Sequence, residues 1–283
     1  MSAYAIATLW LIAKVAVGTA VFLSILAVGQ LLDGRAAGLM VTFPALNGMG
    51  LLAAADLDRV ALDLFPVIAL NGLLCAGCIA VYRRSTELRS NHRLRAAMPY
   101  LALAFWAAVL PFVLWIGGAV NSPIAVIVGY AFVAFALTAV GASRPSPRSH
   151  TETATRAFWS ANRHRIALFV ASLIAVLIAA QFWQGALGWL AALPLVPLFG
   201  IAGIAEERPD RLEDMQETVL FGPLLAMIFV LLLWQFLILL RANVGGPALI
   251  ACSALACLAG WIACVAVIMG SSALDRRRGP RAA

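Results

Sequence analysis

GLMVTFPALNGMGLLAAAD at residues 38–56 and GWLAALPLVPLFGIAGIAE at residues 188–206 are two apolar segments with the same interruptions. Short spans interrupted by glycine and proline at corresponding positions of two halves are the best sequence indication of a transporter binding site. Only four positions are identical, so a chance match in an Ala/Leu/Gly-rich composition is the alternative. The landmarks, six residues apart, are Gly38, Pro44, Gly50 and Asp56 in the first segment and Gly188, Pro194, Gly200 and Glu206 in the second.

The composition points to a membrane protein. The chain has 283 residues, of which 63% are hydrophobic and only 12% charged, and its mean hydropathy is +0.96. A soluble domain carries about 25% charged residues. Apolar runs in lipid must pair their backbone groups internally, so we expect an all-α polytopic membrane protein. The net charge of +7 does not indicate nucleic-acid binding, because the arginines cluster in a few loops.

A helix needs about 20 mostly apolar residues to cross a bilayer, and nine segments of the chain qualify. Two longer polar stretches interrupt them, at 83–95 and 143–165, each with five arginines. We interpret the second as a cytoplasmic linker, which divides the chain into a first half of five spans (1–142) and a second half of four (166–283). The predicted spans are 4–32, 36–55, 60–82, 96–117, 123–142, 166–184, 186–205, 217–240 and 247–270.

The distribution of arginine predicts the orientation of these spans. With the N-terminus outside, 17 arginines fall in cytoplasmic segments and only Arg59 and Arg241 fall outside. Such a split is a strong positive-inside signal. The split therefore predicts that the N-terminus lies outside and that the C-terminus and both long polar stretches lie in the cytoplasm.

This orientation changes the meaning of the two similar segments. Five spans in the first half start the second half from the opposite side, so span two runs outward and span seven runs inward. The pattern therefore predicts an inverted-topology repeat of five and four spans, incomplete because the halves are unequal. Phe65-Pro66 near the start of span three and Phe221-Gly222-Pro223 in span eight extend the match loosely.

Lys14 is the only lysine in the chain and lies inside the first predicted span. A charge at that depth costs about 2.5–3.5 kcal/mol on insertion scales and is a functional-site hypothesis by default. The alternative is a side chain that reaches the outer interface by snorkelling. The preferred partner for the ammonium group is Asp63 in span three, with Asp56 and Asp58 as alternatives.

A second set of candidates consists of polar residues and prolines in or beside the broken spans. Proline frees a backbone carbonyl, and a water-filled cavity or a substrate can satisfy the freed group. Polar side chains in membranes commonly hydrogen-bond between helices instead, and that is the alternative for each of them. The predicted substrate-binding residues are Lys14, Thr42, Pro44, Asn47, Asp63, Asn71, Pro194 and Pro197.

The remaining features favour structural roles. Five cysteines lie in apolar runs, where cysteine usually packs as a small apolar residue. The acidic stretch 206–217 favours a solvated face, with a docking surface for a protein partner or a gate paired to neighbouring arginines as alternatives. No phosphate loop, metal-ligand spacing or nucleophile elbow occurs. We therefore expect no catalytic residue, no metal and no cofactor.

The stretch from Gly188 to Val196, followed by the acidic loop, resembles the small bacterial GlpM-like inner-membrane proteins. The stretch 38–58 is similar to a second, poorer copy of the same pattern. The likeness covers these two parts of the chain only and rests on an apolar span with a central proline and an acidic end. It implies a location in the bacterial inner membrane and implies no catalytic residue.

The leading prediction is a secondary transporter or lipid flippase with nine spans. Its site would lie near the midplane between spans two and seven, where half-helix N-termini favour an anionic group. The expected partners are membrane lipids and a small or amphiphilic substrate. One alternative is a membrane subunit that anchors a larger complex, and a weaker one is a membrane enzyme that acts on lipid.

Overall fold

The computed structural model describes about half of the chain. Described are residues 34–41, 57–87, 92–141, 194–207 and 211–243, with isolated positions at 19, 23 and 51 and within 166–174 and 252–266. These residues form helices joined by short turns, and no strand occurs among them. The all-α prediction is confirmed for this part. Most of the spans predicted at 4–32, 166–184 and 247–270, and the whole linker at 143–165, lie outside it.

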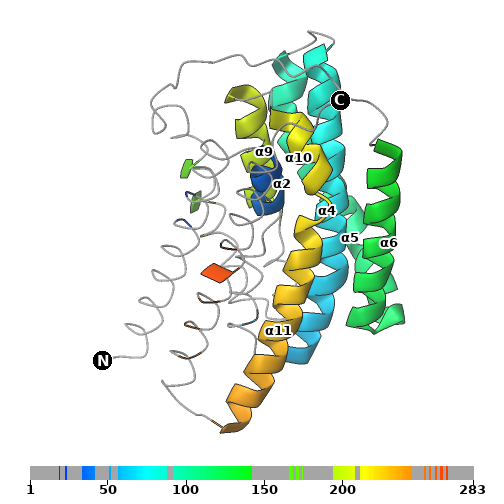
Figure 1. The fold of residues 1–283 in the computed structure, drawn as a ribbon, viewed down its shortest axis with the longest axis vertical. Helices are drawn as coiled ribbons and strands as arrows, with labels where there is room; N and C mark the ends of the chain where they lie inside the picture. Colours follow the sequence, from blue (N-terminus) through cyan, green and yellow to red (C-terminus); the bar gives the residue numbers. More distant parts are fainter. Residues whose placement is uncertain are drawn as a thin grey trace, which may run out of the picture.

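Four long helices correspond to predicted spans three, four, five and eight (Figure 1). Three of them contain stretches long and apolar enough to cross a membrane, namely Leu57–Arg84, Ala97–Val120 and Gly222–Asn243. The fourth has a shorter apolar stretch, Pro123–Ala139. The chain thus has the character of a helical membrane protein. The four helices are α4 (Leu57–Glu87), α5 (His92–Val120), α6 (Pro123–Gly141) and α11 (Gly222–Asn243).

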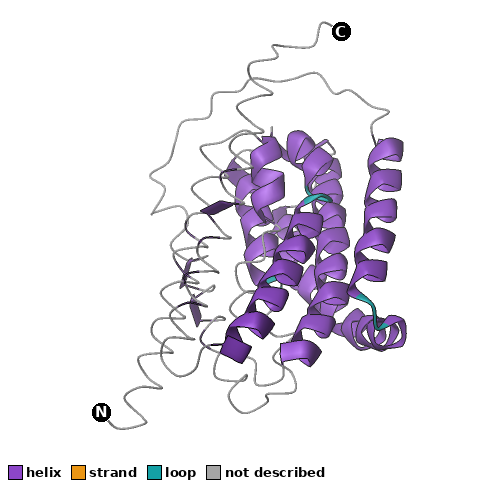
Figure 2. Ribbon diagram, turned by 60° about the horizontal axis from the view of Figure 1, so that its bottom comes forward, coloured by secondary structure: helices purple, strands orange, loops and turns teal. Residues whose placement is uncertain are grey.

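The outer surface of α5 and α6 is made of large apolar side chains. Phe112 is 60% exposed, Trp115 69% and Phe132 77%. In both views α6 stands at the edge of the described helices (Figure 1, Figure 2). Water would penalise so many contiguous exposed apolar side chains, whereas lipid does not. These faces are therefore suited to contact with acyl chains.

The turn between α5 and α6 is fixed by local chemistry. Asn121 has a positive φ of 43°, and its N–H donates to the carbonyl oxygen of Gly117 at 2.9 Å. This is the left-handed cap that commonly ends a helix, and Asn tolerates it better than most residues. Ser122 then precedes Pro123, the first residue of α6, where a missing N–H costs nothing. The predicted boundary at residue 123 is confirmed.

Helix α4 is the centre of the described fold and contacts α5, α6, α9, α10 and α11. Leu64, Phe65 and Ile79 on α4 are almost fully buried. Pro66 lies inside α4, and a Cβ atom at Gly117 of α5 would be only 2.6 Å from its Cγ atom. A glycine is needed there because the α5 backbone approaches the proline ring so closely.

Three short helices gather at the end of α4 that carries Glu87, called here the Glu87 end (Figure 1). They are α2 (Gly34–Val41), α9 (Leu195–Glu207) and α10 (Leu212–Thr218). The sequence predicts an acidic loop up to residue 217 and a span that begins at 217. The structure differs from this prediction, because residues 212–218 form helix α10. Leu212 and Met215 are fully buried, so half of the acidic stretch folds as an amphipathic helix. A turn at 219–221 follows, and α11 begins at Gly222, just before Pro223.

Candidate functional site

The most unusual feature among the described residues is a helix that begins inside an apolar segment. Helix α9 starts at Leu195, directly after Pro194, although the apolar run extends from residue 186. The N–H of Leu198 donates to the carbonyl oxygen of Pro194 at 3.1 Å, which is the first bond of the helix. Pro197 falls in the first turn, where its missing N–H removes no helical hydrogen bond. The predicted break at Pro194 thus coincides with the start of a helix.

The start of α9 is buried. Pro194 is buried, Leu198 is 2% exposed, and residues 200–205 are buried without exception. Helix α9 contacts α4, α5 and α2. The first N–H groups of a helix have no partner within it and carry partial positive charge. The first N–H groups of α9 therefore follow directly on the buried Pro194, within an apolar segment.

Parts of the two similar segments meet in the structure. Helix α2 contains Gly38 of the first segment, and α9 contains Gly200 and Glu206 of the second. The two helices contact each other at the Glu87 end. The expectation that spans two and seven lie face to face agrees with this contact for their described parts.

The predicted substrate-binding residues divide into two groups. Asp63 and Asn71 lie half-buried on α4, about 12 Å apart along the helix axis at 1.5 Å per residue. Pro194 and Pro197 lie at the start of α9, so the described candidates do not form one compact cluster. Lys14, Thr42, Pro44 and Asn47 lie outside the described residues, and so does the pairing of Lys14 with Asp63.

Asn71 makes a hydrogen bond between helices. Its Oδ1 atom accepts a hydrogen bond from Nε1 of Trp106 on α5 at 2.8 Å, and Trp106 is only 2% exposed. The polar group of a buried indole generally needs such a partner. This contact corresponds to the structural alternative for Asn71, in which the amide joins two helices.

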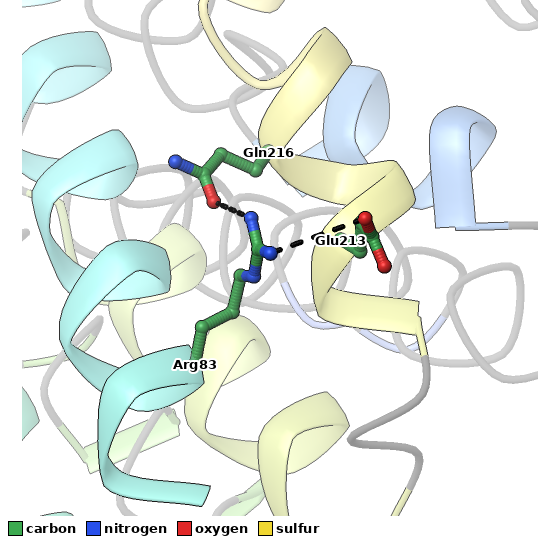
Figure 3. Close-up of polar contacts among 3 residues, drawn as sticks. All are labelled: Arg83, Glu213 and Gln216. Atoms are coloured by element: carbon green, nitrogen blue, oxygen red, sulfur yellow. Dashed lines mark hydrogen bonds and ion pairs between the residues drawn. The ribbon is translucent and has the colours of Figure 1, made fainter. Parts of the chain in front are cut away.

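A polar cluster at the Glu87 end was only partly expected from the sequence. Arg83, in the last turns of α4, donates from one guanidinium nitrogen to Oε1 of Gln216 and lies 4.0 Å from Oε1 of Glu213 (Figure 3). Both acceptors belong to α10. The Arg83 and Glu213 side chains are 28% and 31% exposed, so the ion pair contributes little to stability. The alternative of a gate paired to arginines fits this cluster.

Helix α10 is also fastened to α2. The Thr218 hydroxyl donates to the carbonyl oxygen of Arg35 at 2.7 Å. A Cβ atom at Gly38 would be 2.3 Å from Thr218 Oγ1 and 2.6 Å from the carbonyl oxygen of Met215. Gly38, a landmark of the repeat, therefore permits two backbones to approach closely.

At the opposite end of α4 a hydrogen bond joins it to α11. Trp234 donates from Nε1 to Oδ1 of Asp58 at 2.9 Å. Sequence reasoning considered Asp58 only as a partner for Lys14. A tryptophan 176 residues away gives no sequence signal for such a contact.

The middle of the described fold contains a buried polar contact and two thiols. The Tyr130 hydroxyl donates to the carbonyl oxygen of Leu220 at 3.0 Å. This carbonyl group, in the turn before α11, thereby has a hydrogen-bond partner. Cys75 and Cys78 are free and buried on α4, as the packing interpretation expects. No group of three or more His, Cys, Asp or Glu residues that could hold a metal ion occurs among the described residues.

Comparison of the chain with protein-family models, with curated proteins and with solved structures finds no match. The resemblance to the GlpM-like proteins stays a prediction. The proposed function therefore rests on the residues of the site alone.

Proposed function

We propose that this protein is a transporter or lipid flippase of the bacterial inner membrane that moves a small or amphiphilic substrate past the start of α9. The observation that carries the proposal is the start of α9 directly after the buried Pro194, in a helix that contacts α4 and α5. Discontinuous helices whose N-termini point into the protein are the usual construction of transporter sites. Backbone groups at membrane depth need partners, and a substrate can supply them.

The chemistry of the helix start favours an anionic group. The unpaired N–H groups and the helix dipole both place partial positive charge there. Lys14 is proposed to add a full positive charge, paired with Asp63 when no substrate is bound. Thr42, Pro44 and Asn47 of the first broken span complete the proposed site.

Nine spans and an inverted repeat are part of the same proposal. Helix α4 and helix α11 contact each other and run in opposite directions (Figure 1). An inverted repeat with a pseudo-two-fold axis in the membrane plane requires this of spans three and eight. The membrane orientation has the Glu87 end in the cytoplasm, since Arg35, Arg83, Arg84 and Arg211 belong to that end.

Topology can be tested directly. Reporter fusions at Ala283 and within residues 143–150 are expected to be active only as cytoplasmic fusions, because 17 arginines favour that side. Fusions of a cytoplasmic reporter and of a periplasmic reporter at the same sites measure both outcomes. A periplasmic signal at either site contradicts the inverted repeat.

A second candidate function is an anchor or assembly subunit. Glu213 and Asp214 on α10 are only half-buried and face the side proposed as cytoplasmic. A protein partner with a basic surface would find complementary charge there. Under this alternative the helix start at Leu195 is packed against other side chains and no substrate reaches it. A membrane enzyme that acts on lipid remains the weaker alternative.

Access to the start of α9 separates the transporter from the anchor. Leu198 is 2% exposed, so a cysteine there, in a chain whose five native cysteines are replaced by alanine, is expected to react with a membrane-impermeant maleimide when transport opens the site to water. Adding Pro194→Ala restores an N–H and allows the helix to continue backward, so labelling should fall about tenfold while expression is kept. Labelling of intact cells and of inverted vesicles measures access from each side.

Pro123→Ala is the matched control. Pro123 is the first residue of α6, where alanine is tolerated and no break is removed. It should leave labelling at position 198 unchanged. If position 198 never reacts from either side, the transporter proposal loses its support and the anchor is favoured.

A further inference from the structure

Polar contacts fasten α4 to the second half of the chain near both of its ends. At the Glu87 end Arg83 contacts Gln216 and Glu213, and at the opposite end Asp58 contacts Trp234. These contacts are 25 residues apart on α4, about 37 Å along the axis at 1.5 Å per residue. The hydrocarbon core of a bilayer is about 30 Å thick, so the two contacts lie at opposite interfaces.

Each contact joins a residue of the first half to a residue of the second. Between them, α4 packs against α11. Both helices have buried apolar residues, among them Ala61 and Leu64 on α4 and Val230 and Leu233 on α11. Apolar surfaces have no directional bonds and can slide or rock by small amounts. Hydrogen bonds at the ends are directional and are either made or broken.

The contact between Arg83 and α10 at the Glu87 end has features that allow it to open. Helix α10 is seven residues long, and the turn at 219–221 separates it from α11. Arg83 and Glu213 are partly exposed, so water can replace their contact at little cost. Thr218 and Gly38 hold the far side of α10 against α2. Rupture of the Arg83 contacts would therefore weaken the attachment of α10 to α4, which also includes apolar packing.

The contact at the Leu57 end of α4 involves one pair of side chains. One hydrogen bond from the Trp234 indole to the Asp58 carboxylate crosses between α11 and α4, in an exposed position. A carboxylate acceptor makes it stronger than a neutral hydrogen bond. Its loss would remove this directional contact between the two helices near that interface.

We propose that these contacts are the two gates of the protein, an Arg83 latch at the Glu87 end and a Trp234 latch at the Leu57 end, which open one at a time. Both contacts are formed in the structure. The proposal rests on the proposed transport function, because alternating access requires that one end stay closed while the other opens. It names Gln216 and Trp234 as gate residues, neither of which takes part in the site at α9.

Single cysteines one turn inside each latch report on the gates. Ile79 lies four residues before Arg83 and Ala61 three residues after Asp58, and both are fully buried. Positions three or four apart share a helix face. Ile79→Cys and Ala61→Cys are made separately in the cysteine-free chain. Labelling with a membrane-impermeant maleimide is measured from each side of the membrane.

Opening of one latch should expose one reporter. Arg83→Ala and Gln216→Ala are each expected to raise labelling at position 79 about fivefold, the population change that follows from loss of one net hydrogen bond. Position 61 should not respond to them. Trp234→Phe keeps the ring and removes the N–H, so it should raise labelling at position 61 and leave position 79 unchanged.

Matched controls make the same chemical change away from the latches. Arg84→Ala removes an exposed arginine next to Arg83, and Trp115→Phe removes an indole N–H from a residue that is 69% exposed. Neither should alter labelling at either reporter. The Arg83→Ala, Gln216→Ala double variant should label no more than Arg83→Ala alone, since Arg83→Ala already removes the contact with Gln216.

Two results would contradict the proposal that these contacts are gates. One is unchanged labelling at both reporters in all latch variants. The other is a parallel rise at both reporters in every variant, which means that the contacts only stabilise the fold. The site at α9 is judged separately by the cysteine at Leu198. Reciprocal labelling at 79 and 61 with no reaction at 198 keeps the latches and rejects transport through α9, and the reverse pattern rejects the latches alone.

Discussion

Replacement of Gly72 by alanine is expected to destabilise the protein more than any other single methyl group added to α4. A Cβ atom at this position would lie 2.2 Å from the Tyr130 hydroxyl oxygen and 2.4 Å from Cγ of Pro223. Helices α4, α6 and α11 meet at this point, and the proline ring cannot rotate away. Overpacking of this kind typically costs about 1–3 kcal/mol. Displacement of Tyr130 would also break its hydrogen bond to Leu220.

Gly77→Ala is the control within the same helix. Gly77 is exposed, and a Cβ atom there would meet nothing within 4 Å. Alanine favours a helix over glycine by up to about 1 kcal/mol, so this variant should be neutral or more stable. The midpoint of thermal unfolding in detergent measures both. Equal midpoints for the two alanine variants would contradict the close contact of the three helices.

The membrane helices were predictable because their signal is local. Apolar runs of sufficient length mark α4, α5, α6 and α11, and the residues that end them carry their own chemistry, as Ser122-Pro123 does for α6. The start of α11 was predicted five residues too early, at 217. Hydropathy alone does not register Gly222-Pro223, which starts the helix after a turn.

The polar contacts of the site could not be predicted in the same way. Periodicity assigns a residue to a face of its own helix and does not name its partner on another helix. Arg83 and Gln216 are 133 residues apart, and Trp106 is 35 residues from Asn71. The charge pattern indicated that the acidic stretch could pair with arginines. It did not indicate that residues 212–218 would form a helix packed on α2.

The two proline-interrupted segments were predictable from the sequence only in part. Proline in an apolar run is a local signal, and at Pro194 it marks the start of α9. The contact of α2 with α9 depends on packing, and only the recurrence of glycine and proline in two halves pointed to it. Gly38 illustrates the difference. The similarity of the two segments drew attention to Gly38. A glycine is needed there because Thr218 and Met215 approach its backbone closely, and that contact is not visible in the repeat.

The second large effect is expected at Trp106. Trp106→Ala removes a side chain that is 2% exposed at the contact of α5 with α4. Loss of a buried aromatic ring costs about 3–5 kcal/mol in cores. The thermal midpoint in detergent should fall strongly, and the variant should express poorly. Trp115→Ala, on the same helix but 69% exposed, should have only a small effect.

Trp106→Phe separates the ring from its hydrogen bond and decides the role of Asn71. Phenylalanine keeps most of the packing and leaves Oδ1 of Asn71 without its indole donor, at a cost of about 0.6 to 1.7 kcal/mol for hydrogen bonds within membranes. Asn71→Ala should cost a similar amount, and the double variant should cost less than the sum, since the two residues share one bond. Such coupling means that Asn71 serves the fold. Full additivity would mean that the bond contributes nothing, and it would return Asn71 to the proposed substrate site.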